Sequence, residues 1–170
     1  MRAYTFSKED EIREEKWNKY KLVYAKYVEF YHQDLFKNPL AKEAKDYLKN
    51  RNLTIEEVKK FKIGYVSNDE NFKEEIFKEF NESEIRETGL FYFDENKKKY
   101  VDRFRDRVIF PINNISGDPI ALGGRILKEN KYLAKYINSP ETPFFKKGSN
   151  LYNLDFTRKL SNNIDNIFLV

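Results

Sequence analysis

The first part of the chain repeats apolar residues at helical spacing. Residues 9–37 contain no Gly or Pro, and large apolar side chains recur every three to five positions from Trp17 to Leu35. This spacing predicts one long helix, broken at most once. The helix should end at Asn38, because the residue before Pro39 is disfavoured in the helical region. We expect its tyrosine-rich stripe to lie in the core, and a base-stacking surface is the alternative.

Shorter helices are predicted after this one. Pro39 suits the first turn of a helix whose apolar residues would share one face: Leu40, Ala44, Tyr47 and Leu48. Thr54 and Glu57 have the spacing of a capping box, which predicts another helix start. A strand at 62–66 follows, and residues 67–69 could cap the next helix. The last of these helices should end at Thr88, with Gly89 in the left-handed position beyond it.

After Gly89 the pattern changes to short aromatic and β-branched runs separated by Asn, Asp and Gly. These runs predict strands at 90–93, 99–105, 107–112, 119–127 and 135–137. The fold class is therefore α+β, with a helical N-terminal half followed by an antiparallel β meander and a short helix at 151–160. The final run, Ile167–Val170, is typical of a buried parallel strand. We therefore expect the chain to be a fragment of a longer protein whose next domain begins near residue 165.

Composition excludes several kinds of site. The chain has no Cys and one His, so a thiolate zinc site, a disulfide framework and a cysteine nucleophile are ruled out. We expect His32 to be exposed or to cap a helix. No apolar run reaches the roughly 20 residues needed to span a bilayer, and the N-terminus is charged from Lys8 onward. The expected location is cytoplasmic, without a membrane partner.

The positive charge is concentrated in the second half of the chain. Residues 1–96 hold 18 Lys and Arg against 21 Asp and Glu, whereas residues 97–170 hold 14 against 7, a net charge of +7. A basic half indicates a polyanionic partner, with nucleic acid the first candidate. The 17 Asn residues and the many lysines also fit the codon bias of an A·T-rich genome, so composition alone leaves both explanations open.

The strongest local motif is the run from Asp102 to Pro111, which contains three arginines at alternate positions. In a strand, Arg103, Arg105 and Arg107 would point to one face about 6.6 Å apart. Such a face either binds phosphates or is solvated and paired with acids.

Further cations and aromatic residues follow the arginine motif. Gly123 and Gly124, before Arg125, indicate either a close approach of another segment or a β-bulge. The segments 135–142 and 145–148 then mix cations with aromatic side chains. Single-stranded nucleic acid is bound by this combination, because cations contact phosphates and rings stack on bases.

These segments resemble the RNA polymerase core of bacterial replicative primases, the DnaG family. The resemblance covers roughly residues 25–170 and rests on four segments in order: Tyr100–Ile112, Ala121–Leu127, Lys135–Thr142 and Phe145–Gly148 with Leu151 and Tyr152. It departs from the family at Asn52 and Asn153, which stand where glycine is usual, and at Ala134, where proline is usual. These departures raise the question of local turn geometry.

The resemblance implies a division of the chain and a set of partners. Residues 1–37 would be a lead-in helix, 38–164 the N-terminal subdomain of the primase core (helical 38–89, β-rich 90–164), and 165–170 the start of a truncated Toprim domain. The parent would synthesise RNA primers from ribonucleoside triphosphates on single-stranded DNA, giving an RNA–DNA product, and would bind the replicative helicase through a C-terminal domain outside this chain. Mg²⁺ would be held by carboxylates beyond Val170, and Zn²⁺ by a separate N-terminal module. The fragment would hold no catalytic or metal-binding residue, would be inactive alone and would be monomeric.

The resemblance also implies roles for individual residues. Arg51 matches a basic position at the template groove, and Arg103, Arg105 and Arg107 match the arginine strand, with Arg107 the one that could be structural. The other matching positions would face the cleft and bind template or triphosphate: Arg125, Lys135, Tyr136, Asn138 and Lys147. Glu141 could be an acid near the metal, although an anchor for the Pro140 turn is favoured. A stand-alone single-strand-binding module and another Toprim enzyme are the alternative functions.

Overall fold

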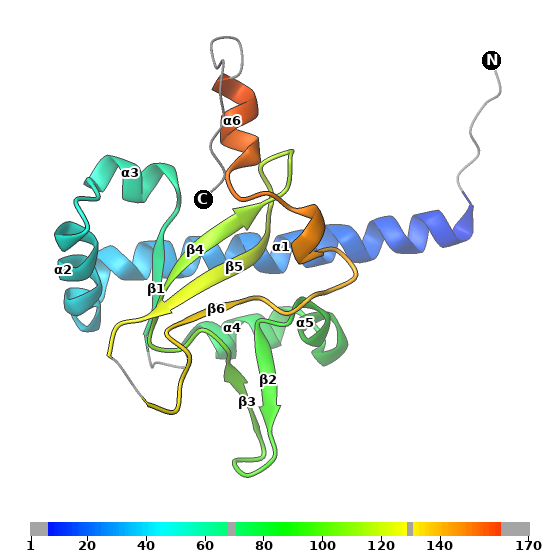
Figure 1. Cartoon of the computed structure of the whole chain (residues 1–170). Helices are drawn as coiled ribbons and strands as arrows, with labels where there is room; N and C mark the ends of the chain where they lie inside the picture. Colours follow the sequence, from blue (N-terminus) through cyan, green and yellow to red (C-terminus); the bar gives the residue numbers. More distant parts are fainter. Residues whose placement is uncertain (1–6, 68–70, 129–130, 161–170) are drawn as a thin grey trace.

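The computed structural model describes residues 7–67, 71–128 and 131–160 and shows a mixed α/β fold (Figure 1). Its helices are α1 (Lys8–Lys37), α2 (Lys42–Asn50), α3 (Ile55–Lys60), α4 (Asn71–Glu79), α5 (Glu82–Thr88) and α6 (Leu154–Leu160), with 3₁₀ turns η1 (Pro39–Ala41) and η2 (Lys147–Ser149). Its strands are β1 (Gly64–Val66), β2 (Phe91–Asp94), β3 (Lys99–Asp102), β4 (Arg107–Asn113), β5 (Pro119–Ile126) and β6 (Tyr136–Asn138). The predicted α+β class is confirmed. No helix in the described ranges is long and apolar enough to cross a membrane.

The strands form two antiparallel sheets and not one meander. Strand order in the larger sheet is β1-β4-β5-β6, so β1 from the helical half pairs with β4 from the β-rich half. Strands β2 and β3 form a separate hairpin, which extends away from the larger sheet in Figure 1. The sequence pattern predicted the strand positions well but could not show that β1 would join the later strands, because this pairing depends on tertiary contacts.

Helix α1 crosses one face of the four-stranded sheet and buries a continuous apolar stripe in the core. It is unbroken over 30 residues, and its predicted stripe is buried: Tyr20, Val23, Tyr24, Tyr27, Val28, Tyr31 and Leu35. Ring contacts extend the stripe to Trp17, whose ring centroid lies 5.1 Å from that of Phe144. The core interpretation of the stripe is therefore confirmed.

Helix α1 approaches the sheet closely at Gly64 of β1. A Cβ atom at this position would lie 2.8 Å from the carbonyl carbon of Tyr31 and 3.0 Å from the backbone nitrogen of His32. His32 is itself buried, and its Nδ1–H donates to the carbonyl oxygen of Ile63 at 2.7 Å. The expectation that His32 is exposed or caps a helix is wrong, because this hydrogen bond attaches α1 to the segment that enters β1.

Local signals set the helix ends. The capping box of Thr54 and Glu57 is present, and Gly89 ends α5 with φ of 68°. Leu40 does not share the buried face of α2, because residues 39–41 form the 3₁₀ turn η1, and its side chain is 64% exposed. The second core cluster lies under α2 and α3 and includes Leu48, Val58, Tyr65 and Val108.

The backbone at Asn52 and Asn153 shows the turn geometry at the two positions where the family usually has glycine. Their φ angles are 59° and 60°, so both adopt the left-handed conformation that glycine adopts most easily. Asn is the side chain that tolerates this region best after glycine. Both asparagines therefore adopt the backbone conformation that the turns require, without glycine at either position. The predicted cap at 68–69 and the run 167–170 lie outside the described residues.

Replacing Gly64 with alanine should destabilise the fold by about 1–3 kcal/mol, because the new methyl group meets backbone atoms that cannot rotate away. Urea unfolding of the purified chain measures this change. Gly148→Ala is the matched control, since a Cβ there has no atom within 4 Å and should shift stability by less than about 0.5 kcal/mol. Equal stability of the two variants would contradict the close packing of α1 on β1.

Candidate nucleic-acid interface

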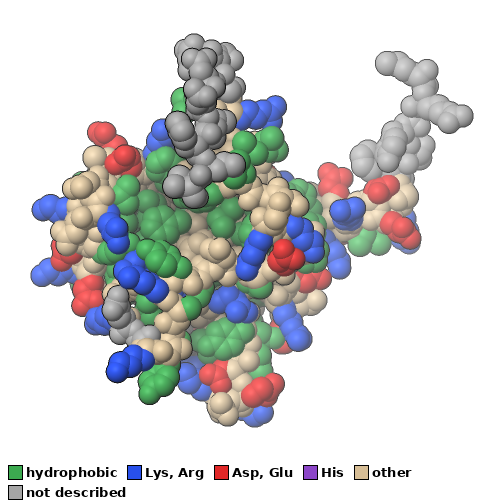
Figure 2. All heavy atoms as spheres, viewed as in Figure 1, with side chains coloured by type: hydrophobic (Ala, Val, Ile, Leu, Met, Phe, Trp, Pro, Cys, Tyr) green, Lys and Arg blue, Asp and Glu red, His purple; other side chains and the backbone are tan. Residues whose placement is uncertain are grey.

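The face of the larger sheet that α1 does not cover carries a column of alternating aromatic rings and guanidinium groups. Side chains alternate between the two faces of a strand, which places Arg125 of β5 and its cross-strand partners Val108 and Tyr136 on this same face. Helix α2 and its C-terminus add Tyr47 and Arg51 beside them. The face forms the front of the molecule in Figure 2, where Lys and Arg side chains surround apolar ones.

Arg125 stands at the centre of this stacked column. Its guanidinium carbon lies 4.9 Å from the ring centroid of Tyr47 and 5.4 Å from that of Tyr136. The guanidinium carbon of Arg51 also lies over the Tyr47 ring, 5.6 Å from its centroid. The column therefore runs Arg51, Tyr47, Arg125, Tyr136. Each cation lies on the electron-rich face of a ring, which holds both guanidinium groups in place.

Arg125 is 7% exposed and is incompletely hydrogen-bonded. Its Nη1 donates to the carbonyl oxygen of Ile126, but its Nε has no hydrogen-bond partner among the described residues. A buried donor without a partner costs about 1–3 kcal/mol, and it is often satisfied by a ligand or water. Tyr136, at the end of the column, is 59% exposed and offers its ring to solvent. The column is thus a cationic and aromatic surface with one donor available.

The predicted arginine strand is wrong. Strand β3 ends at Asp102, residues 103–106 form a turn, and β4 begins at Arg107. We call residues 103–106 the arginine turn. The chain reverses there because the Asp102 carboxylate accepts from the Phe104 backbone N–H at 2.8 Å and Asp106 adopts φ of 60°. The three arginines therefore do not share one face.

Each of these arginines has its own environment. Arg103 donates from Nε to the Gly89 carbonyl oxygen at 2.8 Å, and its guanidinium carbon lies 5.6 Å from the Tyr92 ring centroid. Arg105 is partly exposed, with its Nε 3.8 Å from an Asp106 carboxylate oxygen. A phosphate-binding role for these two residues stays a prediction.

Arg107 is a structural residue in this arrangement. It is 4% exposed, and its Nη1 donates to the carbonyl oxygen of Lys135 at 3.3 Å. Burial lowers the pKa of its guanidinium. Its Cδ atom packs beside Gly124, where an added Cβ would also lie 2.6 Å from the Phe104 ring. Gly124 therefore makes room for Phe104, and the bulge predicted for the glycine pair is absent from the described strand, whose only register shift lies at Ile112 and Asn113 of its neighbour.

A buried carboxylate fixes the position of the arginine turn. Tyr27 of α1 donates to both Asp102 oxygens at 2.7 and 2.9 Å, and Tyr31 donates to one at 3.3 Å. Burial raises the pKa of Asp102 to about 6, although the hydrogen bonds from Tyr27 and the Phe104 backbone oppose the shift. Because α1 is fixed on the sheet, these bonds hold the start of the turn against the core.

The remaining predicted site residues lie along the β6 side of the sheet. Asn138 pairs with Gly123 and shares the face of Tyr136, whereas the carbonyl oxygen of Lys135 accepts from the backbone N–H of Ile126. Lys147 begins η2, and its backbone N–H donates to a Glu141 carboxylate oxygen at 3.1 Å. Glu141 is therefore an anchor of the turn, as favoured. Binding roles for Lys135, Asn138 and Lys147 stay predictions.

Two residues of this surface were missed by sequence reasoning. Tyr47 was assigned only to the apolar face of its helix, and Tyr92 only to a strand. Tyr47 lies four residues before Arg51, and residues at this spacing are neighbours on a helix, so the pairing could have been predicted. No local signal could have paired Tyr92 with Arg103, because the contact depends on the turn after β3.

Comparison with known proteins agrees with this fold. Residues 30–158 match the family model of the DNA primase catalytic core, N-terminal domain. The DNA primase of Pseudomonas putida is 41% identical over 84% of this chain, which spans 22% of that protein's length. The DNA primase of Enterococcus faecalis is 36% identical over 81% of this chain, which spans 23% of that protein's length. A solved DnaG primase catalytic domain bound to single-stranded DNA has a TM-score of 0.77 and 30% identity, covering 89% of this chain and 46% of that one. A DNA primase domain from Pseudomonas aeruginosa has a TM-score of 0.74 and 38% identity, covering 86% and 46%.

Changing Asp102 to Asn should remove a specific dependence of stability on pH. The folded pKa is raised from its ordinary value of 3.8 to about 6, so the folded state binds more protons than the unfolded state between these values. The wild type should therefore gain about 1 kcal/mol from this group as pH falls from 7 to 5, and lose it as pH rises through 6. Asn keeps the acceptor oxygen but does not titrate.

Urea unfolding of both proteins at pH 5, 6 and 7 measures this effect. The free energy of unfolding of Asp102→Asn minus that of wild type should fall by about 1 kcal/mol between pH 7 and pH 5, since the other carboxylates are common to both. An unchanged difference across this range would show that Asp102 is not buried as described.

Proposed function

The chain belongs to the DNA primase family, as the N-terminal domain of the catalytic core, and on this premise we propose that it supplies the basic wall that binds single-stranded DNA template and ribonucleoside triphosphates during primer synthesis. The observation that carries the proposal is the stacked column beside the arginine turn. It combines fixed cations with an exposed ring, the two groups that single-stranded nucleic acid requires. The structure of a related catalytic domain with single-stranded DNA supports the same assignment.

The column suits a flexible strand better than a duplex. Arg125 is buried between two rings, so its guanidinium cannot follow a moving phosphate, but it polarises and fixes the exposed ring of Tyr136. A base can stack on that ring, and such a stack contributes about 1–3 kcal/mol. Arg51 and Arg103, at the margins, can neutralise phosphates on either side. In this division of roles the centre binds bases and the margins bind the backbone.

Metal chemistry is assigned to other parts of the parent protein. Primer synthesis is a nucleotidyl transfer, in which Mg²⁺ neutralises the transferred phosphate. The described residues include no group of three or more His, Cys, Asp or Glu side chains that could hold a metal ion. The sequence has no Cys for a zinc module. The residues in the described ranges therefore do not fit either metal, and we assign this chain binding and positioning without a metal-dependent step.

The partners outside this chain follow from the family. We propose that the parent protein makes an RNA–DNA product, binds the replicative helicase through another domain and acts in the cytoplasm. A stand-alone single-strand-binding module is the second candidate, because the stacked column alone would serve it. The two candidates differ in whether RNA is synthesised on the bound strand when the carboxylate-bearing domain is present.

Binding of single-stranded DNA should weaken with salt, and Arg51→Ala and Arg103→Ala should each reduce the slope of log K against log salt by about 0.7. Fluorescence anisotropy of a labelled oligonucleotide at several salt concentrations gives this slope. Lys26→Ala is the matched control, since it removes one charge from α1, on the covered side of the sheet, and only an exposed ion pair with Glu79. Equal slopes for all four proteins would contradict the proposed phosphate contacts.

The 170-residue chain alone should make no dinucleotide from ribonucleoside triphosphates and Mg²⁺ on a single-stranded template. The reason is that the described residues provide no carboxylate cluster for the metal. Thin-layer or mass-spectrometric detection of dinucleotide measures this, with a complete DNA primase as positive control. Synthesis by the chain after removal of contaminating polymerase would overturn the proposed division of roles.

A further inference from the structure

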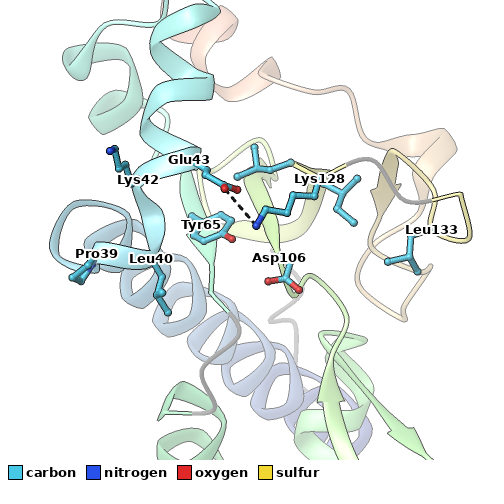
Figure 3. Close-up of a pocket in the computed structure, with 10 residues that line it drawn as sticks. Pro39, Leu40, Lys42, Glu43, Tyr65, Asp106, Lys128 and Leu133 are labelled. Atoms are coloured by element: carbon cyan, nitrogen blue, oxygen red, sulfur yellow. Dashed lines mark ion pairs between the residues drawn. The ribbon is translucent and has the colours of Figure 1, made fainter.

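A pocket that is separate from the stacked column lies between the start of α2, strand β1 and the ends of β4 and β5 (Figure 3). Its volume is about 610 Å³, within the usual range for a small-ligand site. Leu40, Ile126 and Leu127 form apolar walls, and Glu43, Tyr65 and Asp106 provide polar groups. The exposure of Leu40, unexplained by the packing of α2, is accounted for by its place in this wall.

The hydroxyl group of Tyr65 is directed into this pocket. The residue as a whole is 8% exposed, but its hydroxyl oxygen is not among the buried polar atoms that lack a partner, so the pocket leaves it accessible. Figure 3 shows the hydroxyl pointing toward the space between Glu43 and Asp106. Burial, with these two carboxylates, raises the pKa of Tyr65 to about 12, so at neutral pH it is an O–H donor. An accessible O–H donor in a pocket can donate a hydrogen bond to a ligand that enters it.

Asp106 is held rigidly at the edge of the pocket. Its backbone N–H donates to the Val66 carbonyl oxygen at 2.8 Å, and its backbone adopts the left-handed conformation with φ of 60°. The Glu43 carboxylate lies 3.4 Å from the ammonium nitrogen of Lys128, but both side chains are well exposed. An exposed pair of this kind contributes little, so it can open at low cost when a ligand enters.

We propose that this pocket binds a guanine base of the single-stranded DNA, an inference that rests on the proposed template-binding function. Guanine presents two adjacent donors, N1–H and the N2 amino group, which a carboxylate accepts as a pair, as at Asp106. Its O6 is an acceptor for the Tyr65 hydroxyl. The leucine side chains contact the faces of the ring. Thymine has one donor between two carbonyl groups and would place an acceptor against the carboxylate.

The charges around the pocket favour a base over a basic protein side chain. Lys42 and Lys128 line the pocket, and Arg105 neighbours Asp106, so three cations surround two carboxylates. A positively charged peptide would be repelled at this rim. A nucleotide strand would instead place its phosphates on the cations and a base in the pocket. The pocket adjoins the arginine turn, since Asp106 is the last residue of that turn.

The test uses uncharged nucleosides and the full chain. Chemical shifts in ¹H–¹⁵N spectra should move around Tyr65 and Asp106 on addition of 2′-deoxyguanosine, and thymidine should bind at least fivefold more weakly. Asp106→Asn and Tyr65→Phe should each weaken deoxyguanosine binding at least fivefold. Asn tolerates the left-handed backbone at position 106, and Tyr65→Phe removes only the hydroxyl, so one variant checks the other if either fails to fold. Lys26→Ala should bind like the wild type.

Equal affinity for the two nucleosides, or unchanged deoxyguanosine binding in both variants, would overturn the inference. Binding of N-acetyl-arginine amide at the pocket in preference to deoxyguanosine would also overturn it and assign the site to a basic side chain. Nucleosides carry no phosphate, so this measurement does not depend on the salt-sensitive binding of DNA. The salt slopes of the Arg51 and Arg103 variants test the proposed template binding, and nucleoside binding tests the guanine pocket, so failure of one proposal is distinguished from failure of the other.

Discussion

Four buried tyrosine hydroxyl groups on α1 set the main constraint on this fold. A buried hydroxyl must find a hydrogen-bond partner, and here the partners lie on separate elements. Tyr20 donates to the Ile120 carbonyl oxygen of β5, Tyr24 to the Thr88 carbonyl oxygen of α5, and Tyr27 to Asp102 of β3. One helix therefore fixes the positions of the larger sheet, the last N-terminal helix and the hairpin together.

The interface depends on this helix even though α1 contributes no side chain to the stacked column. The column lies on the opposite face of the sheet, and its central arginine is carried by β5, which α1 holds in place. The arginine turn is held through Asp102 in the same way. One face of the sheet thus packs on the core, and the opposite face carries the exposed stacked column. The family model begins at residue 30, inside α1, although Tyr20, Tyr24 and Tyr27 complete the core before it.

Much of the fold could be predicted because its signals are local. The helical stripe, the capping box at Thr54 and the glycine after α5 each depend on residues within a few positions of one another. The turn that ends the strand before Arg103 includes a local hydrogen bond from the Phe104 backbone to Asp102, but the bond from Tyr27 that holds this carboxylate depends on tertiary packing and could not be predicted. The expectation that His32 is exposed or caps a helix was wrong because its hydrogen bond to the Ile63 carbonyl oxygen also depends on tertiary packing. For the site, the resemblance pointed to Arg51, Arg125 and Tyr136 separately, and the structure brings them together, whereas it buries Arg107.

The long sequence separation of the tyrosine contacts also sets the order of events during synthesis on the ribosome. Tyr20 reaches Thr142, 122 residues later, and Tyr24 reaches Ser139, 115 residues later. At about 5–20 residues per second, the tyrosine stripe waits roughly 6–24 s before its last partner exists. During that interval the helix can form but its apolar face is uncovered, so the nascent chain exposes an aromatic surface that is prone to non-specific association. Completion of the core therefore comes late, when the β-rich half emerges and closes over a helix that was made first.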